Sequence, residues 1–208
     1  MPTQLLLATR NSGKLGELRR ILEISGVDGL QVVGLADLAS FPEAPETGAT
    51  FEDNALAKAR DAAAATGLPS VADDSGLTVD ALGGMPGVLS ARWAGRHGSR
   101  DERDAANLSL VLDQLADVPD PRRGAAFVCA AALVTPSGVE HVARGEWHGW
   151  LTRAPRGSNG FGYDPIFVPE GQQRTSAERD PADKDAVSHR GQALRALLPA
   201  LRELTGTL

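Results

Sequence analysis

The sequence of 208 residues predicts an α/β fold with a mixed central sheet flanked by helices. Two observations support this prediction. In the first half of the chain, short apolar runs of strand length alternate with segments of helical periodicity, which is typical of α/β folds. Two long strands then follow one another in the second half without a helix between them, so the sheet is expected to be mixed rather than fully parallel.

The first half of the chain begins with a strand, a helix and a second strand. The apolar runs at 4–8 and 30–35 have the length of buried strands. The helix between them is expected to start at Ser12, which can serve as its N-cap. Its apolar residues recur at helical spacing and are Leu15, Leu18, Ile21 and Leu22.

The next helix and strand lead to a pair of adjacent aspartates. A helix is expected at 50–65, with Thr50 as the N-cap of a capping-box pattern. A short strand at 69–72 should end in Asp73 and Asp74. The serine and glycine that follow are expected to form a turn that exposes both carboxylates.

The second half adds a helix, two long strands and a final helix. The segment 100–116 is amphipathic, and the continuous apolar run at 125–134 suits a central strand buried on both faces. A turn at 135–138 should connect this strand to its partner at 138–151. Pro199 should kink or divide the final helix, whose leucines form one stripe.

Composition and charge narrow the function classes. Hydrophobic residues make up 42% and charged residues 23% of the chain, which is typical of a soluble globular protein. The net charge of -6 and the pI of about 5.2 give no general electrostatic reason to bind nucleic acid or an anionic membrane. No apolar run has the length of a membrane span. With Cys129 as the only cysteine, no intrachain disulfide can form, and we expect a cytoplasmic location.

The first polar cluster is "ATRNSGK" (8–14), at the predicted strand-to-helix turn. Its side-chain donors, its glycine and its cation are Thr9, Asn11, Ser12, Gly13 and Lys14. The free N–H groups of a helix start favour an anion. The pattern is not a P-loop, because position 8 lacks glycine and position 15 lacks serine or threonine. The cluster predicts an anion site or, alternatively, a capped helix start with a surface lysine.

The second and third clusters are acidic. Glu46 can serve as a metal ligand, although an exposed acidic loop is the alternative, and Lys58 could face either solvent or the active site. In an extended strand adjacent side chains point to opposite faces, so Asp73 and Asp74 are not expected to share a proton. One should face the active site, while the other bonds to backbone or reaches a metal. The alternative is an Asx-turn or a helix cap.

The fourth cluster is "GFGYDP" (160–165), in a glycine-rich loop that enters a strand. Phe161 and Tyr163 could stack on a planar base, and Asp164 could accept a hydrogen bond from the base or orient a neighbour. The alternative is a hairpin with ordinary packing aromatics.

The fifth cluster surrounds the start of the final helix. Lys184 precedes this helix, and Ser188, His189 and Arg190 lie at its first turn. Cations at a helix N-terminus oppose the macrodipole, which indicates an anionic or electron-rich partner for them. The alternative is an ordinary surface pair.

Taken together, six motifs closely resemble those of the inosine triphosphate pyrophosphatase family. They occur in the family's order, span residues 8 to 194, and read "ATRNSGK", "ETGATFEDNALAKA", "ADDSGL", "PGVLSAR", "GFGYDPIF" and "SHRGQAL". The resemblance implies an elongated single domain over 1–208, with an active-site cleft between two lobes. It also implies a homodimer. From the charge and the lack of a membrane-length apolar run, we expect neither nucleic acid nor a membrane as a partner.

The resemblance further implies a Mg²⁺-dependent hydrolysis of ITP, dITP or XTP to the nucleoside monophosphate and pyrophosphate, by water attack at the α-phosphate. Glu46 and Asp74 would bind the metal, and Asp74 would also be the general base. The residues that would bind substrate are Thr9, Arg10, Asn11, Ser12, Gly13, Lys14, Ser75, Phe161, Gly162, Tyr163, Asp164, Lys184, His189 and Arg190.

Two rival functions remain open from the sequence. A Maf-type pyrophosphatase acting on modified pyrimidine nucleotides is disfavoured by the "GFGYDP" and "SHR" segments. A non-catalytic nucleotide-binding regulator would tolerate loss of Glu46 or Asp74, yet both acidic residues are present.

Overall fold

A computed structural model describes residues 2–10, 12–38, 41, 45–180 and 187–206, and contains one six-stranded sheet in the order β2-β1-β3-β4-β5-β6. The strands are β1 (Thr3–Leu7), β2 (Leu30–Gly34), β3 (Ser70–Val79), β4 (Gly124–Val134), β5 (Glu140–Leu151) and β6 (Phe167–Pro169). β1 pairs in parallel with β2 and β3, whereas β5 and β6 are antiparallel. The predicted mixed sheet is therefore confirmed.

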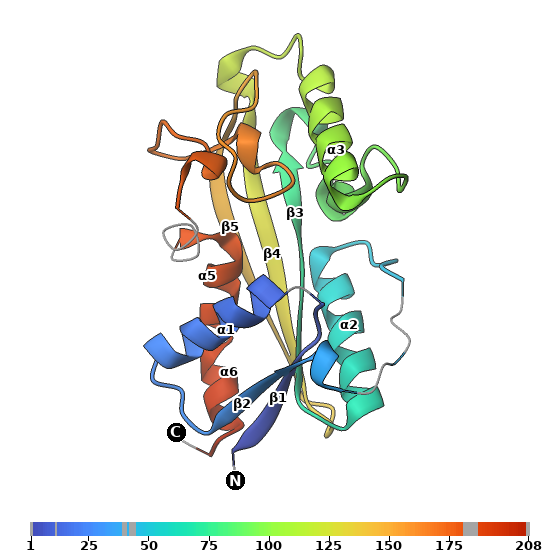
Figure 1. Ribbon diagram of the computed structural model, residues 1–208, viewed down its shortest axis with the longest axis vertical. Helices are drawn as coiled ribbons and strands as arrows, with labels where there is room; N and C mark the ends of the chain where they lie inside the picture. The colour runs from blue at the N-terminus through green and yellow to red at the C-terminus, as the bar shows by residue number, and fades with distance from the viewer. Residues whose placement is uncertain (1, 11, 39–40, 42–44, 181–186, 207–208) are drawn as a thin grey trace. The chain divides into compact units, whose positions relative to one another are not determined.

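The described helices flank this sheet, as predicted for an α/β fold (Figure 1). They are α1 (Ser12–Ile24), α2 (Phe51–Thr66), α3 (Arg100–Gln114), α5 (His189–Ala196) and α6 (Leu198–Glu203). None of them has the length and apolar character needed to cross a membrane.

The chain forms two compact units. Unit 1 comprises Met1–Asp74, Cys129–Gly145 and Arg190–Leu208, and unit 2 comprises Ser75–Val128 and Glu146–His189. The predicted cleft between two lobes of a single domain stays a prediction.

Unit 1 has a core on each face of its strands. Alternate residues of β1 point to opposite faces, so Leu5 and Leu7 pack with the apolar faces of α1, α5 and α6, while Leu6 packs with Ala62 of α2. Figure 1 shows α1 and α6 on one side of these strands and α2 on the other. α1 and α5 therefore pack on one face of these strands, and α2 packs on the other.

Local sequence signals explain two helix boundaries of unit 1. Thr50 caps α2, with Thr50 Oγ1 accepting from the Asp53 N–H and the Thr50 N–H donating to Asp53 Oδ2, both at 3.1 Å. The predicted capping box is thus confirmed. Pro199 stands in the first turn of α6, and the final helical segment is divided at Leu197 as predicted.

The prediction for β3 is wrong at its end. The strand continues through the two aspartates to Val79, so Ser75 and Gly76 lie within the strand instead of forming a turn. Gly76 is required there for packing, because a Cβ at this position would come within 2.3 Å of Ser90 Oγ. Both aspartates are consequently buried rather than exposed.

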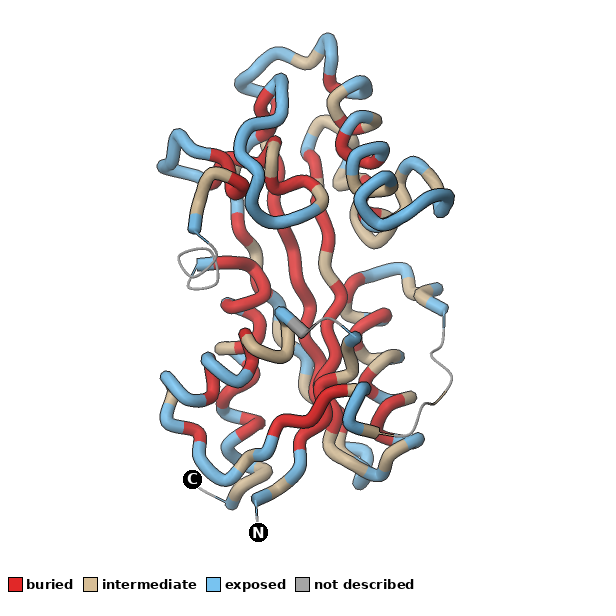
Figure 2. The backbone as a smooth tube through the Cα atoms, viewed as in Figure 1, coloured by how far each residue is buried: buried red, intermediate tan, exposed pale blue. Residues whose placement is uncertain are grey.

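Unit 2 contains residues 75–79 of β3, 124–128 of β4 and 146–151 of β5. Its core joins the apolar faces of α3 and β5 with Tyr163, Ile166 and Phe167 from the segment before and at β6. β4 is buried along nearly its entire length, as Figure 2 shows and as predicted for a central strand. Arg123 is also buried here, and its guanidinium donates to the carbonyls of Leu115, Leu151 and Thr152 at 2.7–2.9 Å.

Candidate active site

Asp73 lies at the centre of a buried ionic cluster in unit 1. Its Oδ2 accepts from Lys14 Nζ at 2.7 Å and from Arg190 Nε at 3.1 Å. Lys14 belongs to the first turn of α1, and Arg190 to the first turn of α5. We call these three residues the Asp73 cluster. The cationic residue expected at the final helix start thus has Asp73 as one anionic partner.

Charge pairing controls the ionisation of the Asp73 cluster. Burial alone would raise the pKa of Asp73, but the charges of Lys14 and Arg190 outweigh it and hold the pKa well below its usual range. Burial would likewise lower the pKa of Arg190, yet the Asp73 carboxylate raises it above the usual range. Asp73 is therefore ionised at neutral pH and committed to its two cations.

Asp74 belongs to a second cluster, reached from α2. Lys58 Nζ lies 3.0 Å from Asp74 Oδ1, 2.5 Å from Glu46 Oε1 and 3.2 Å from the carbonyl oxygen of Asp73. We call Glu46, Lys58 and Asp74 the carboxylate–lysine cluster. The adjacent aspartates therefore contact different elements, which confirms the predicted alternation and excludes a shared proton in this structure.

Asn54 fixes the geometry around the carboxylate–lysine cluster. Its side-chain Nδ2 donates to Asp74 Oδ2 at 2.9 Å, and its Oδ1 accepts from the Gly48 N–H at 2.8 Å. Gly48 leaves space for this contact, since a Cβ there would lie 2.7 Å from Asn54 Oδ1. The segment just after Glu46 and the strand that carries Asp74 are thus tied to one buried amide.

Burial and charge oppose each other in the carboxylate–lysine cluster. Burial raises the pKa of Asp74, and the opposing effects of Lys58 and Asn54 do not cancel it. Burial lowers the pKa of Lys58, but Asp74 and Glu46 outweigh burial and the net shift is upward. A carboxylate with a raised pKa is better suited to accept a proton than the strongly acidic Asp73.

The sequence alone does not single out Asn54, and it leaves open whether Lys58 faces solvent or the active site. The signal was present, because residues four positions apart lie on the same helical face. Asn54 and Lys58 have this spacing on α2 and contact opposite oxygens of Asp74. Two polar side chains at this spacing on one helical face are the pattern that would have indicated a common partner.

Glu46 and Asp74, the two predicted metal ligands, both contact the ammonium of Lys58. Within the described residues, no group of three or more histidine, cysteine, aspartate or glutamate side chains converges on one point. Two carboxylates still suit a hard cation such as Mg²⁺, which binds proteins through one or two carboxylates and completes its shell with water and phosphate oxygens. The donor set of Glu46 and Asp74 therefore fits such a cation.

The two aromatic rings of the 160–165 loop in unit 2 differ in exposure. Phe161 is 49% exposed, whereas Tyr163 is buried in the core and donates its hydroxyl to the Ser90 carbonyl at 2.8 Å. Asp164 accepts from the Phe161 N–H at 2.9 Å and so orients its neighbour, one of the two roles considered for it. Gly160 has a φ of +78°, and a Cβ there would collide with the Asp164 carboxylate. Phe161 therefore exposes its ring, as stacking on a base requires, whereas Tyr163 does not.

Three further contacts in unit 2 involve this loop and His189, the first residue of α5. The Arg100 guanidinium lies over the Phe161 ring, 5.0 Å from its centroid, and the Gly162 N–H donates to Asp104 Oδ2 at 3.2 Å. His189 is buried and stacked on Phe127, with 5.1 Å between ring centroids.

The remaining predicted site residues divide between described and undescribed parts of the chain. Thr9 and Arg10 lie in the β1–α1 connection of unit 1, and Ser12 and Gly13 are the first two residues of α1. Ser75 lies within β3 and belongs to unit 2. Asn11 and Lys184 lie outside the described residues.

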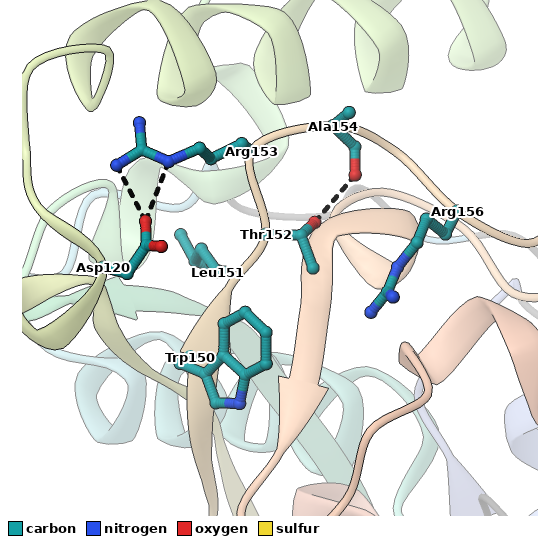
Figure 3. A pocket seen from close by; sticks show the side chains of 7 residues that line it. All are labelled: Asp120, Trp150, Leu151, Thr152, Arg153, Ala154 and Arg156. Carbon is teal, nitrogen blue, oxygen red and sulfur yellow. Dashed lines mark hydrogen bonds and ion pairs between the residues drawn. The ribbon is translucent and has the colours of Figure 1, made fainter.

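A surface pocket in unit 2 contains none of the predicted site residues. Its volume is about 270 Å³, and it opens beside the exposed ring of Trp150 at the end of β5 (Figure 3). Arg153 at its rim is paired with Asp120 at 2.7 Å. Arg156, the other arginine of the lining, lies 3.8 Å from Glu178. Because both arginines have an acidic partner and the ionic clusters are elsewhere, this pocket is not our candidate active site.

Comparisons with known proteins agree with the motif pattern. The model of the Ham1 family matches residues 5–200. A protein of Nocardia farcinica named dITP/XTP pyrophosphatase is 66% identical over 201 residues, covering 97% of this chain and 96% of the relative.

Solved structures give the same result. A nucleoside-triphosphatase / dITP/XTP pyrophosphatase from Mycobacterium abscessus has 63% identity and a TM-score of 0.79, and the match covers 96% of this chain and all of that one. A HAM1 protein from Coxiella burnetii has 44% identity and a TM-score of 0.86, with 97% and 99% of the two chains covered. The similarity therefore extends over nearly the full length of each chain.

Proposed function

The chain belongs to the Ham1 family, and on this premise we propose that it hydrolyses the non-canonical purine nucleotides ITP, dITP and XTP to the nucleoside monophosphate and pyrophosphate. The observation that carries the proposal is the carboxylate–lysine cluster. It presents Asp74, a buried carboxylate with a raised pKa, next to a second carboxylate, Glu46. This combination suits a metal-assisted attack of water on a phosphoanhydride.

Mg²⁺ is the cation we propose for Glu46 and Asp74, and when bound it would offset the negative charge of the triphosphate and of the pyrophosphate leaving group. Asp74 would orient the attacking water and take its proton at a carboxylate oxygen. Asn54 holds the other oxygen of Asp74 and so limits rotation of the carboxylate. A general base of this kind contributes about 10²–10⁴-fold to the rate.

The β1–α1 connection is the proposed triphosphate site of unit 1. Lys14 brings a cation to the first turn of α1, where the helix start also favours an anion. We assign phosphate contacts to this connection, in the segment from Thr9 to Lys14. Arg190 also lies 3.9 Å from the buried Glu17 carboxylate, so the charges around Asp73 balance and the group carries no surplus positive charge. The proposed phosphate site therefore depends on Lys14 and on the helix start.

Base recognition is proposed for the residues of the fourth and fifth motifs. The exposed ring of Phe161 could stack on the purine, because one aromatic face is sufficient for base stacking. A side-chain donor such as His189 or Arg190 would bond a 6-oxo group but would meet the 6-amino group of adenine donor to donor. Such a buried mismatch costs about 1–3 kcal/mol. We also retain Ser75, Gly162, Tyr163, Asp164 and Lys184 as proposed substrate contacts.

A cytoplasmic homodimer without a nucleic-acid partner completes the proposal. The single cysteine and the net charge of -6 support the location and the absence of nucleic-acid binding. The dimer is supported by the family resemblance of the motifs.

The test is to incubate the purified protein with Mg²⁺ and a panel of purine and pyrimidine nucleoside triphosphates, and to assay pyrophosphate and orthophosphate separately. We expect pyrophosphate from ITP, dITP and XTP, with much slower release from ATP. Orthophosphate as the sole product would contradict the proposed bond cleavage. Binding of nucleotides without hydrolysis would favour a regulator on the same fold.

A further inference from the structure

We propose that the ammonium of Lys58 and a divalent cation bind the same oxygens of Glu46 and Asp74 in turn, so that Lys58 occupies the metal site until the metal displaces it. The inference rests on the proposed function only for the identification of these two carboxylates as metal ligands. It adds a positioning residue, Lys58, whose place is exchanged with the cation during each binding event.

The contacts of the ammonium are those of a cation in an oxygen cage. Lys58 Nζ has one carboxylate oxygen of Glu46 at 2.5 Å, one of Asp74 at 3.0 Å and the Asp73 carbonyl at 3.2 Å. An ammonium has three donors, and three oxygens are within their reach. Carboxylate and carbonyl oxygens are also the ligand types of hard divalent cations. The same oxygens therefore suit either cation.

The oxygen set does not depend on Lys58 for its shape. Asn54, which is 2% exposed, binds Asp74 Oδ2 and the backbone N–H of Gly48, two residues after Glu46. The capping box at Thr50 and Asp53 fixes the start of the helix that carries Asn54. Withdrawal of the ammonium would leave these contacts intact, so the two carboxylates remain near each other for an incoming cation.

Lys58 can leave, because its side chain reaches solvent. The Lys58 side chain is 25% exposed, compared with 20% for Lys14 and 11% for Arg190 in the Asp73 cluster. A lysine presents a compact charge on a flexible four-carbon stem, which can change direction without moving the helix. A divalent cation placed beside the ammonium would be repelled at a distance of a few ångströms, so the two cannot occupy the cage together.

Charge arithmetic gives the consequence for metal affinity. With Lys58 in place the carboxylate–lysine cluster carries a net charge of about -1, from two carboxylates and one ammonium. Without the ammonium the same oxygens carry about -2. Removal of Lys58 should therefore strengthen metal binding in the absence of nucleotide, the reverse of what removal of a residue that assists the metal would do.

The experiment measures Mn²⁺ binding to the full chain without nucleotide, by the loss of the free-ion electron paramagnetic resonance signal. We compare the wild type with Lys58→Met and with Arg60→Met. Arg60 is a matched control, since it removes one positive charge from the same helix but pairs with Glu140 away from the cluster. We expect the Kd for Mn²⁺ to fall roughly tenfold or more in Lys58→Met and to stay within about twofold in Arg60→Met. An equal or weaker affinity in Lys58→Met would overturn the inference.

A second measurement uses the unmodified protein, in case Lys58→Met does not fold. The sequence contains three lysines, Lys14, Lys58 and Lys184, so a protein labelled with ¹³C at lysine Cε gives a simple NMR spectrum. The Mg²⁺ concentration that displaces Mn²⁺ from the protein is first measured by competition. Titration of the labelled, Mn²⁺-free protein with Mg²⁺ up to this concentration should shift the Lys58 signal most. A Lys58 signal that does not move at this concentration would contradict displacement.

Failure of this inference and failure of the proposed function are distinguishable. An enzyme that releases pyrophosphate from ITP, with unchanged Mn²⁺ affinity in Lys58→Met, would overturn the exchange alone. Tighter Mn²⁺ binding in Lys58→Met together with no hydrolysis of any nucleotide would support the exchange and overturn the proposed activity.

Discussion

The two units bury polar groups in opposite ways. In unit 1, buried charges contact other charges, as in the pairing of Arg190 with Asp73. In unit 2, the buried guanidinium of Arg123 donates to three neutral carbonyls, and the Tyr163 hydroxyl donates to another. Neutral partners hold a structure together without a strong local field. Paired charges create the field that a metal ion and a triphosphate require.

We therefore expect the two units to contribute to different properties of the protein. The ionic clusters of unit 1 should determine turnover and its dependence on metal and pH. The hydrogen bonds of unit 2 should determine the stability of a loop that offers one exposed ring. Substitutions in unit 1 should therefore change kcat or acid stability, and substitutions in unit 2 should separate substrate affinity from folding.

The largest effect is expected from Asp74→Asn. The amide can still accept from Asn54 but cannot take a proton from water, so kcat for ITP should fall by about 10²–10⁴-fold. Steady-state kinetics with pyrophosphate detection measures this change, and thermal unfolding checks that the variant is folded. A kcat close to that of the wild type would show that the general base lies elsewhere.

The next effect is on stability, from Asp73→Asn. Removing this carboxylate leaves Lys14 and Arg190 facing each other without its compensating charge, which should cost roughly 3–5 kcal/mol in the free energy of unfolding. Urea denaturation at neutral pH measures the loss. A difference below about 1 kcal/mol, as for a surface ion pair, would contradict a buried cluster.

The same variant should change the acid dependence of stability. The pKa of Asp73 is lowered in the folded protein, so its stabilisation is present above the unfolded value of about 3.9 and is lost as pH falls below it. The wild type should lose stability below about pH 4 more steeply than Asp73→Asn. Parallel pH profiles for the two proteins would contradict the assigned pairing.

A smaller effect is expected on substrate affinity, from Phe161→Leu. Base–aromatic stacking contributes about 1–3 kcal/mol, so KM for ITP should rise roughly tenfold. The free energy of unfolding should fall by about 1 kcal/mol or less, because the ring is half exposed and loses its contact with Arg100. An unchanged KM would remove Phe161 from the proposed base contacts.

The smallest effect should come from Tyr163→Phe, the matched variant in the same loop. Loss of the hydroxyl leaves the Ser90 carbonyl without this donor and should lower stability by about 1 kcal/mol. KM for ITP should be unchanged, in contrast to Phe161→Leu, because the hydroxyl is bonded to Ser90 and the proposed substrate contact of Tyr163 is assigned to its backbone, which the variant keeps. A raised KM with unaltered stability would instead identify the Tyr163 hydroxyl as a substrate contact.

The sequence was sufficient where structure depends on neighbours along the chain. The capping box at Thr50 and the helix break at Pro199 involve residues within one or two turns, and both predictions are confirmed. The mixed sheet was predicted from runs of apolar residues of strand length. Such runs are buried whichever neighbouring element packs against them.

The sequence was insufficient where a distant residue decides the outcome. The serine and glycine at 75–76 are typical of a turn, but they lie in a strand. Gly76 packs there against Ser90, which is 14 positions away in the chain. Tyr163 stands in a glycine-rich loop, and its burial depends on the core of unit 2 and on the distant carbonyl of Ser90, which accepts its hydroxyl. The division of Asp73 and Asp74 between two sets of cations likewise required three helices to be placed around β3.

The most direct test of the account follows the oxygen of the attacking water. Hydrolysis of ITP in H₂¹⁸O, with Mg²⁺ present, should place ¹⁸O in the nucleoside monophosphate and none in the pyrophosphate, because Asp74 is proposed to direct water to the α-phosphate. Mass spectrometry of both products distinguishes the positions. Label in the pyrophosphate would mean attack at the β-phosphate and would contradict the central claim.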